Sequence, residues 1–255
     1  MVRARVRQVA RATGFLGITA VMVPPFARDL RRARPGEQRE LRDAWVKRWA
    51  SALLRLFAIE VDVEGAVPPR SGPRGRLLVA NHRSAIDIGV LLATFGGKMV
   101  SRDDVAGWPI VGAAARTAGT VFVDRKNAES GAAAIRLIQN QLELGETVAL
   151  FPEGTTFEGD DVRPFHGGAF VAAVRAEAEI LPVGLAYPKS SGAAYVNETF
   201  VKHLGRVARS ESTRMALAVG EPIAVTRKER AKNVAERAHD RVQALVSIAR
   251  QRCGE

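Results

Sequence analysis

The chain has 255 residues, of which 47% are hydrophobic and 25% are charged, so it can bury a sizeable core and is not expected to be disordered. Its single cysteine, Cys253, excludes an intrachain disulfide and a cysteine metal cluster, and it favours a reducing, cytosol-facing location. The net charge of +11 predicts an anionic partner, either a nucleic acid or a membrane surface.

Most of the positive charge lies in the first 55 residues, which contain 13 Lys or Arg and 4 Asp or Glu. An uncharged run of 16 residues, 12–27, follows Arg11 and contains Pro24 and Pro25. A membrane-spanning helix needs about 20 apolar residues, so we expect this run to be interfacial or re-entrant and broken at the prolines. A secretory signal peptide is the alternative, but no A-x-A-like cleavage site follows the run.

Residues 44–59 predict an amphipathic helix. On a helix of about 3.6 residues per turn, one stripe collects its apolar side chains, which are Trp45, Val46, Trp49, Ala52, Leu53, Leu56 and Phe57. Such a stripe either packs on the core of a domain or enters a membrane interface, and the pattern is compatible with both. We therefore predict that residues 1–58 form basic, amphipathic, membrane-associating helices.

From residue 60 onward, short apolar runs typical of strands alternate with helical patterns. Strands are predicted at 60–65, 77–81, 98–101, 120–124, 147–151, 180–187 and 214–220, and helices at 87–95, 110–118, 127–144, 168–178 and 228–251. This alternation predicts an α/β domain over 59–255, with a mixed, partly parallel sheet flanked by helices. Functional side chains are then expected at strand ends and in the loops after them.

The segment LLVANHRSAIDIGVLL, residues 77–92, places His82 and Asp87 between two apolar flanks. Two side chains five residues apart do not share a face of a helix or a strand, so this pair can meet only across a bend. Ser84 and Asp87 also form an S-x-x-D pattern, which indicates a helix cap with Ser84 as the N-cap and no catalytic role. These residues alone leave both interpretations open.

Two other predicted strand ends carry polar side chains. In FPEGTT, residues 151–156, Gly154 permits a tight loop whose backbone N–H groups can face a ligand oxygen. GTVFVDR, residues 119–125, ends in Arg125, whose guanidinium suits a phosphate but could equally form a surface ion pair with Asp124 or Glu153.

The segments NHRSAID, GTVFVDR, FPEGTT and ILPVG occur in this order. In this combination the sequence resembles the glycerolipid acyltransferase family, which includes 1-acylglycerol-3-phosphate acyltransferases, over about residues 60–225. The resemblance implies that His82 and Asp87 are the catalytic pair. It also implies an acceptor-binding site that contains Arg102, Arg125, Glu153, Gly154 and Thr155.

Two positions depart from the family pattern. Arg102 stands where the family commonly has a lysine, and His166 occupies a position that is commonly basic. An arginine keeps the charge but changes its geometry, and the charge of a histidine depends on pH. Both departures concern the headgroup of the acceptor and not the class of reaction.

The resemblance implies transfer of a fatty acyl chain from an acyl thioester, carried by coenzyme A or acyl carrier protein, to the free hydroxyl of a lysophospholipid. The simplest case converts 1-acylglycerol-3-phosphate to phosphatidic acid, with His82 as general base and Asp87 orienting its imidazole. No metal and no cofactor beyond the thioester co-substrate is implied. The alternatives are another lysolipid acceptor, such as a lyso amino-acid lipid, and a non-catalytic membrane-binding scaffold.

Membrane lipid is the partner that these features favour. A nucleic-acid partner needs basic side chains interleaved with stacking aromatics, but aromatics make up only 6% of the chain. Basic side chains attract anionic headgroups and favour the cytoplasmic leaflet. We therefore expect a monotopic or peripheral protein on the cytoplasmic face of the cell membrane.

Overall fold

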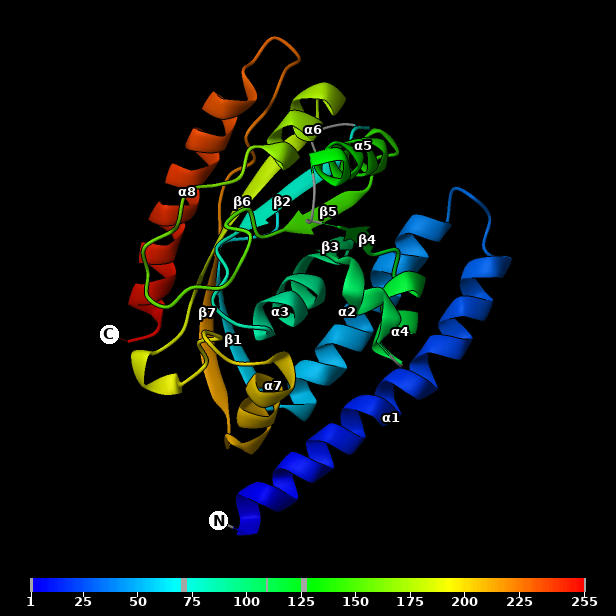
Figure 1. The fold of residues 1–255 in the computed structure, drawn as a ribbon. Helices are drawn as coiled ribbons and strands as arrows, with labels where there is room; N and C mark the ends of the chain where they lie inside the picture. The colour runs from blue at the N-terminus through cyan, green and yellow to red at the C-terminus, as the bar shows by residue number, and fades with distance from the viewer. Residues whose placement is uncertain (1, 70–72, 109, 125–127, 255) are drawn as a thin grey trace.

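The computed structural model describes residues 2–69, 73–108, 110–124 and 128–254, and it contains a seven-stranded sheet (Figure 1). The strand order is β1-β7-β6-β2-β5-β3-β4, and every neighbouring pair is parallel except β6 and β7. The strands are β1 (Ile59–Glu64), β2 (Arg76–Ala80), β3 (Lys98–Arg102), β4 (Val121–Val123), β5 (Thr147–Leu150), β6 (Glu179–Ala186) and β7 (Thr213–Val219). The predicted mixed, partly parallel sheet is confirmed.

Helices cover both faces of the sheet and form two large hydrophobic cores, besides a small third cluster between α8 and strands β6 and β7. One core packs α5 (Ala128–Glu143), α6 (Gly168–Ala176) and α8 (Ala231–Arg252) against the sheet. The other packs α2 (Gln38–Leu56), α3 (Ile86–Phe95) and α7 (Phe200–Arg209). Strand β2 is buried throughout and sends alternate side chains to the two cores, which explains its continuous apolar sequence.

The remaining elements are α1 (Val2–Arg32), α4 (Val111–Thr117) and two short 3₁₀ helices, Asp103–Gly107 and Lys189–Ser191. Helix α7 was not among the predicted elements. Its apolar residues Phe200, Leu204 and Val207 recur at helical spacing, but they are interspersed with basic side chains. That spacing is the signal from which α7 could have been predicted.

Helix α1 continues through Pro24 and Pro25, so the predicted break at the prolines is wrong. Contacts with α2 on both sides of the prolines support the helix: Trp49 Nε1 donates to Thr19 Oγ1 at 3.1 Å, and Phe26 stacks on Trp45. These tertiary contacts offset the backbone hydrogen bonds that proline removes. Among the described helices, α1 alone is long and apolar enough, by length and composition only, to cross a membrane.

The apolar stripe of α2 packs inside the protein. Of the stripe, Val46 and Phe57 are buried in the core between α2, α3 and α7, while the half-buried Trp45 and Trp49 contact α1. Packing on the domain therefore accounts for these four side chains, and contact of this segment with a membrane stays a prediction.

Arg11 attaches α1 to the domain. Its guanidinium is buried and donates to four backbone carbonyl groups: Leu56 O at 2.9 Å, Ala208 O at 3.3 Å, Ser210 O at 2.6 Å and Glu211 O at 3.1 Å. These carbonyls lie at or just beyond the C-terminal ends of α2 and α7, where helices leave carbonyls unpaired and carry partial negative charge. The start of α1 is thereby held against two other helices.

We predict that Arg11→Met lowers the free energy of unfolding by about 1–3 kcal/mol, because the carbonyls lose their buried donor. Urea denaturation followed by circular dichroism measures the change. Arg5→Met is the matched control, since Arg5 is exposed on the same helix and its loss should change stability by no more than about 0.5 kcal/mol. Equal effects of the two substitutions would contradict an anchoring role for Arg11.

Candidate active site

His82 and Asp87 meet across the bend between β2 and α3. His82 follows the end of β2, Asp87 lies in the first turn of α3, and His82 Nδ1 is 2.8 Å from Asp87 Oδ2. The bend predicted between the strand and the helix is therefore present and brings the two side chains into contact.

The carboxylate of Asp87 is fully buried and has four hydrogen-bond partners. Besides His82, Oδ2 accepts from the backbone N–H groups of Arg83 at 2.7 Å and Ser84 at 2.8 Å, and Oδ1 accepts from Tyr187 Oη at 2.5 Å. Burial first, and then the charge of Asp87, raise the pKa of Tyr187, so its hydroxyl stays protonated and donates. This set of partners fixes the orientation of Asp87.

Ser84 is not the N-cap of α3. That position is Ala85, in the helical region of φ/ψ and without a side-chain cap. The shorter contacts run in the opposite direction: the side chain of Asp87 accepts from the N–H groups of Arg83 and Ser84. Ser84 Oγ lies 3.1 Å from His203 Nε2 on α7, and it also accepts from Ile86 N, in the first turn of α3, at 3.3 Å.

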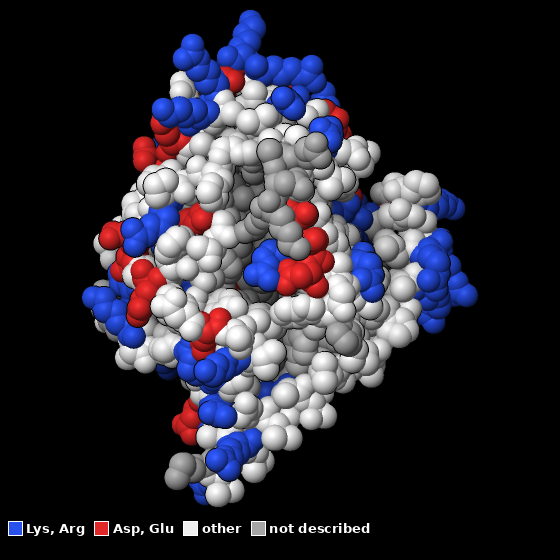
Figure 2. Space-filling view, viewed as in Figure 1, with Lys and Arg blue, Asp and Glu red and all other residues white. Residues whose placement is uncertain are grey.

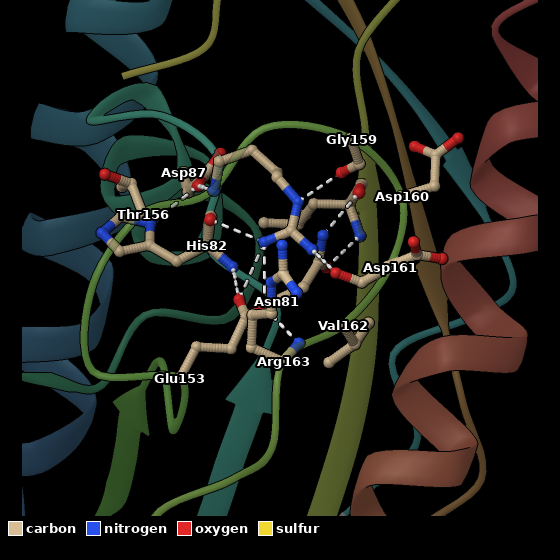
Figure 3. A network of polar contacts seen from close by, with 12 residues as sticks. Asn81, His82, Asp87, Glu153, Thr156, Gly159, Asp160, Asp161, Val162 and Arg163 are labelled. Carbon is tan, nitrogen blue, oxygen red and sulfur yellow. Dashed lines mark hydrogen bonds and ion pairs between the residues drawn. The ribbon is translucent and has the colours of Figure 1, made fainter. Parts of the chain in front are cut away.

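Glu153, just after β5, holds the main chain of His82 in place (Figure 3). Its buried carboxylate accepts from His82 N at 2.6 Å and Arg163 N at 2.8 Å, and it pairs with Arg83 Nη1 at 2.9 Å. Arg83 also donates to the carbonyl oxygens of Gly159 and Asp161. In the described structure Glu153 is therefore paired with Arg83, a partner that the sequence analysis did not predict. The signal for that partner was an arginine in the polar bend between the apolar strand and the apolar helix.

The ring of His82 lies at the wall of a cavity of about 1310 Å³. It stacks on Phe151 with ring centroids 3.8 Å apart, and its side chain keeps 16% of its exposure. Among the described residues, none hydrogen-bonds His82 Nε2. With Nδ1–H directed at Asp87, the Nε2 lone pair of a neutral imidazole is available as a base.

Apolar side chains form most of the cavity wall and come from several helices, for example Trp49, Leu92 and Ile135. The volume exceeds the range of about 300–1,000 Å³ that is usual for small-molecule sites. The cavity therefore suits a long apolar ligand whose reactive group reaches His82.

The same cavity collects most of the other predicted site residues: Arg102, Glu153, Gly154, Thr155 and His166. Arg125 lies outside the described residues. Asp104 accepts from Nε and Nη2 of Arg102, one edge of the guanidinium, and this hydrogen bonding raises the pKa of Arg102. Binding of substrate by these residues stays a prediction.

Gly154 has a left-handed backbone, with φ +80, and a Cβ there would lie 2.9 Å from the ring of His166. Its N–H donates to Phe151 O at 3.1 Å and so closes the turn. The glycine therefore allows His166 to approach the loop. Among the described residues, no group of three or more His, Cys, Asp or Glu side chains is placed to hold a metal ion.

Comparison with known proteins shows which family this sequence resembles. The model of the acyltransferase family matches residues 38–186. A lyso-ornithine lipid O-acyltransferase of Pseudomonas aeruginosa is 33% identical over 227 residues, which cover 86% of both chains. A 1-acyl-sn-glycerol-3-phosphate acyltransferase of Neisseria gonorrhoeae is 31% identical over 137 residues, 54% of both chains.

The crystal structure of the 1-acyl-sn-glycerophosphate (LPA) acyltransferase from Thermotoga maritima has the same fold, with a TM-score of 0.72 at 19% identity. The match covers 97% of this chain and 98% of that one. The chain belongs to the acyltransferase family, which confirms the resemblance inferred from the four sequence segments.

We predict that Arg83→Met lowers the free energy of unfolding by about 3–5 kcal/mol, because it leaves the carboxylate of Glu153 buried without a counter-charge. Urea denaturation measures the loss. The double variant Arg83→Met/Glu153→Gln should recover part of it, since the second substitution removes the unpaired charge. Strictly additive losses would mean that the pair does not act as a unit.

Proposed function

We propose that this protein moves a fatty acyl chain from an acyl thioester to the free hydroxyl of a lysolipid. The observation that carries the proposal is the His82–Asp87 contact at the wall of a large apolar cavity in a member of the acyltransferase family. The thioester, carried by coenzyme A or acyl carrier protein, is a co-substrate, and the scheme uses no other cofactor.

In this mechanism His82 Nε2 takes the proton of the acceptor hydroxyl as its oxygen attacks the thioester carbonyl carbon. The carbon–sulfur bond then breaks, the acyl chain forms an ester with the acceptor, and the leaving thiolate receives the proton. Asp87 holds the imidazole in the required tautomer and stabilises the imidazolium that forms. Phe151 supports the ring from one face.

Two acceptors have separate support. A lyso-ornithine lipid is favoured by the extent of the similarity, because the relatives of that name from Pseudomonas aeruginosa and Brucella abortus match 86% and 82% of this chain. The second candidate is 1-acylglycerol-3-phosphate, which the four sequence segments imply. A relative of that name from Neisseria gonorrhoeae matches 54% of this chain.

We also propose that the protein acts while bound to the cytoplasmic face of the cell membrane, as a monotopic or peripheral protein. Helix α1 is apolar along its middle and basic near its ends, and Arg11 keeps its start on the domain. Figure 2 shows Lys and Arg side chains grouped at the upper end and on the right-hand side of the molecule, whereas Asp and Glu accompany them on the left and near the centre. Such basic regions attract anionic headgroups.

His82→Ala should lower the rate of acyl transfer from palmitoyl-CoA by at least about 100-fold, because the general base is lost. Thiol release and lipid product are both measured, and circular dichroism verifies the fold. His239→Ala, on α8 and outside the cavity, is the control and should retain the native rate. Native activity in His82→Ala would rule out His82 as the base.

The acceptor is tested by comparing kcat/KM for a lyso-ornithine lipid, 1-acylglycerol-3-phosphate and a neutral lysolipid with one donor. We expect the lyso-ornithine lipid to give the highest value, by at least about 10-fold, which corresponds to about 1.4 kcal/mol. A preference for 1-acylglycerol-3-phosphate would instead select the second candidate. Turnover with none of them, using either carrier, would contradict the proposed function.

A further inference from the structure

Helix α7 and the loop before it carry a second histidine–carboxylate pair, behind the His82–Asp87 bend. His203 is fully buried, and its Nδ1 lies 3.0 Å from Glu198 Oε1. On its other edge, Nε2 lies 3.1 Å from Ser84 Oγ and 3.4 Å from Ala85 N. This pair connects α7, which contains none of the four family segments, to the segment that carries His82.

The partners of His203 define its protonation. Two groups lie near Nδ1: Glu198 Oε1, which only accepts hydrogen bonds, at 3.0 Å, and Arg206 Nη2, which only donates, at 3.1 Å. Arg206 Nη2 already donates to Ala194 O and to Glu198, so we assign the proton of the neutral ring to Nδ1, directed at Glu198. Nε2 is then the acceptor for Ser84 Oγ–H and Ala85 N–H. Burial lowers the pKa of His203, which favours the neutral ring, and Arg206 pairs with Glu198 on its outer side.

The bend is consequently held from two sides. Asp87 takes the N–H groups of Arg83 and Ser84, whereas His203 takes the hydroxyl of Ser84 and the N–H of Ala85. Buried polar groups left without partners cost about 1–3 kcal/mol each, so a bend with these four donors satisfied is rigid.

Tyr195 adds a further link between α7 and this bend. Its N–H donates to Arg83 O at 2.8 Å, and its ring stacks on that of His203 with centroids 4.6 Å apart. The carbonyl oxygen of Tyr195 accepts from Thr156 in the FPEGTT loop. The segment before α7 thus connects the two loops that flank the candidate active site.

We propose that His203 is a positioning residue for acyl transfer: its Nε2 holds the 83–85 bend in the one conformation in which Asp87 orients His82. This rests on the proposed function of His82 as general base. The proposal predicts that acyl transfer requires the hydrogen-bond acceptor at Nε2 of His203, and that the size of the ring alone is not sufficient.

Ser84, His203 and Glu198 also have the order of a serine nucleophile, a base and an acid. Ser84 is fully buried, however, and is absent from the cavity wall, whereas His82 lies on that wall. An attacking oxygen must come within about 3–3.5 Å of the thioester carbon. The geometry therefore favours positioning over covalent catalysis by Ser84.

The test compares His203→Phe, which keeps a ring of similar shape, with His203→Gln, whose amide oxygen can replace the Nε2 acceptor. We expect kcat to fall about 10–100-fold in His203→Phe, because small displacements of reacting groups cost rates of that order, with KM within about twofold of native. His203→Gln should recover at least about half of the native kcat. His239→Phe, on α8, is the matched control.

Hydrogen–deuterium exchange of the peptide containing residues 81–95 supplies a readout that does not need turnover. Protection of this segment should fall in His203→Phe and return in His203→Gln. Native kcat and protection in His203→Phe, or equal losses in Phe and Gln variants that are both folded, would overturn the proposal. So would a stable acyl adduct on Ser84 in intact-mass analysis after incubation with palmitoyl-CoA.

The two proposals fail separately in this design. If native protein and His82→Ala are equally active, or if neither turns over with any donor and acceptor, the proposed function fails. The exchange experiment then still decides whether His203 holds the bend.

Discussion

The buried carboxylate of Asp87 is the constraint on which the rest of the site depends. A carboxylate without solvent is stable only where donors surround it, and four donors do so here: the ring of His82, the N–H groups of Arg83 and Ser84, and the hydroxyl of Tyr187. Two of these donors are backbone groups of the bend itself. The conformation of the chain between β2 and α3 and the orientation of Asp87 therefore determine each other.

The order of the sheet brings the partners of this carboxylate together. Strands β6, β2 and β5 are parallel neighbours, so their carboxyl ends lie side by side. His82 follows β2, Glu153 follows β5 and Tyr187 follows β6. Glu153 then holds the main chain of His82, while Tyr187 holds the side chain of Asp87. Neighbouring strand ends of this kind are where parallel α/β sheets place binding groups.

The sequence predicted the parts of this arrangement that are local. The alternation of strands and helices was sufficient for the sheet, and a spacing of five residues was sufficient to place His82 and Asp87 on either side of a bend. It did not predict which buried arginine would pair with Glu153, or that Tyr187 and His203 would approach the bend. Those contacts join residues about 70 to 120 positions apart, and their specificity comes from strand order and packing.

The break predicted at the two prolines of α1 is wrong for the same reason: contacts with distant residues decide the local structure. Local chemistry predicts a break, but Trp45 and Trp49 of α2 hold the helix on both sides of Pro24 and Pro25. Local propensity is a weak prior that packing can override. Helix α7 is the opposite case, a helix that was present but not predicted. Its run of apolar residues at helical spacing is short, and its role depends on the elements that it contacts.

Helix α7 connects the apolar cavity with the His82–Asp87 bend. Leu204 and Val207 line the cavity together with Phe15 of α1, and His203, between them and the loop, contacts the His82–Asp87 bend. Arg11 binds carbonyls at the end of α7 and so links α1 to the same helix. A displacement of α7 would therefore change three things together: the wall of the cavity, the contacts of Arg11 that hold α1, and the contacts of His203 with the bend before Asp87. These three parts of the structure depend on one helix, because different residues at or near α7 contact the cavity, Arg11 and the bend.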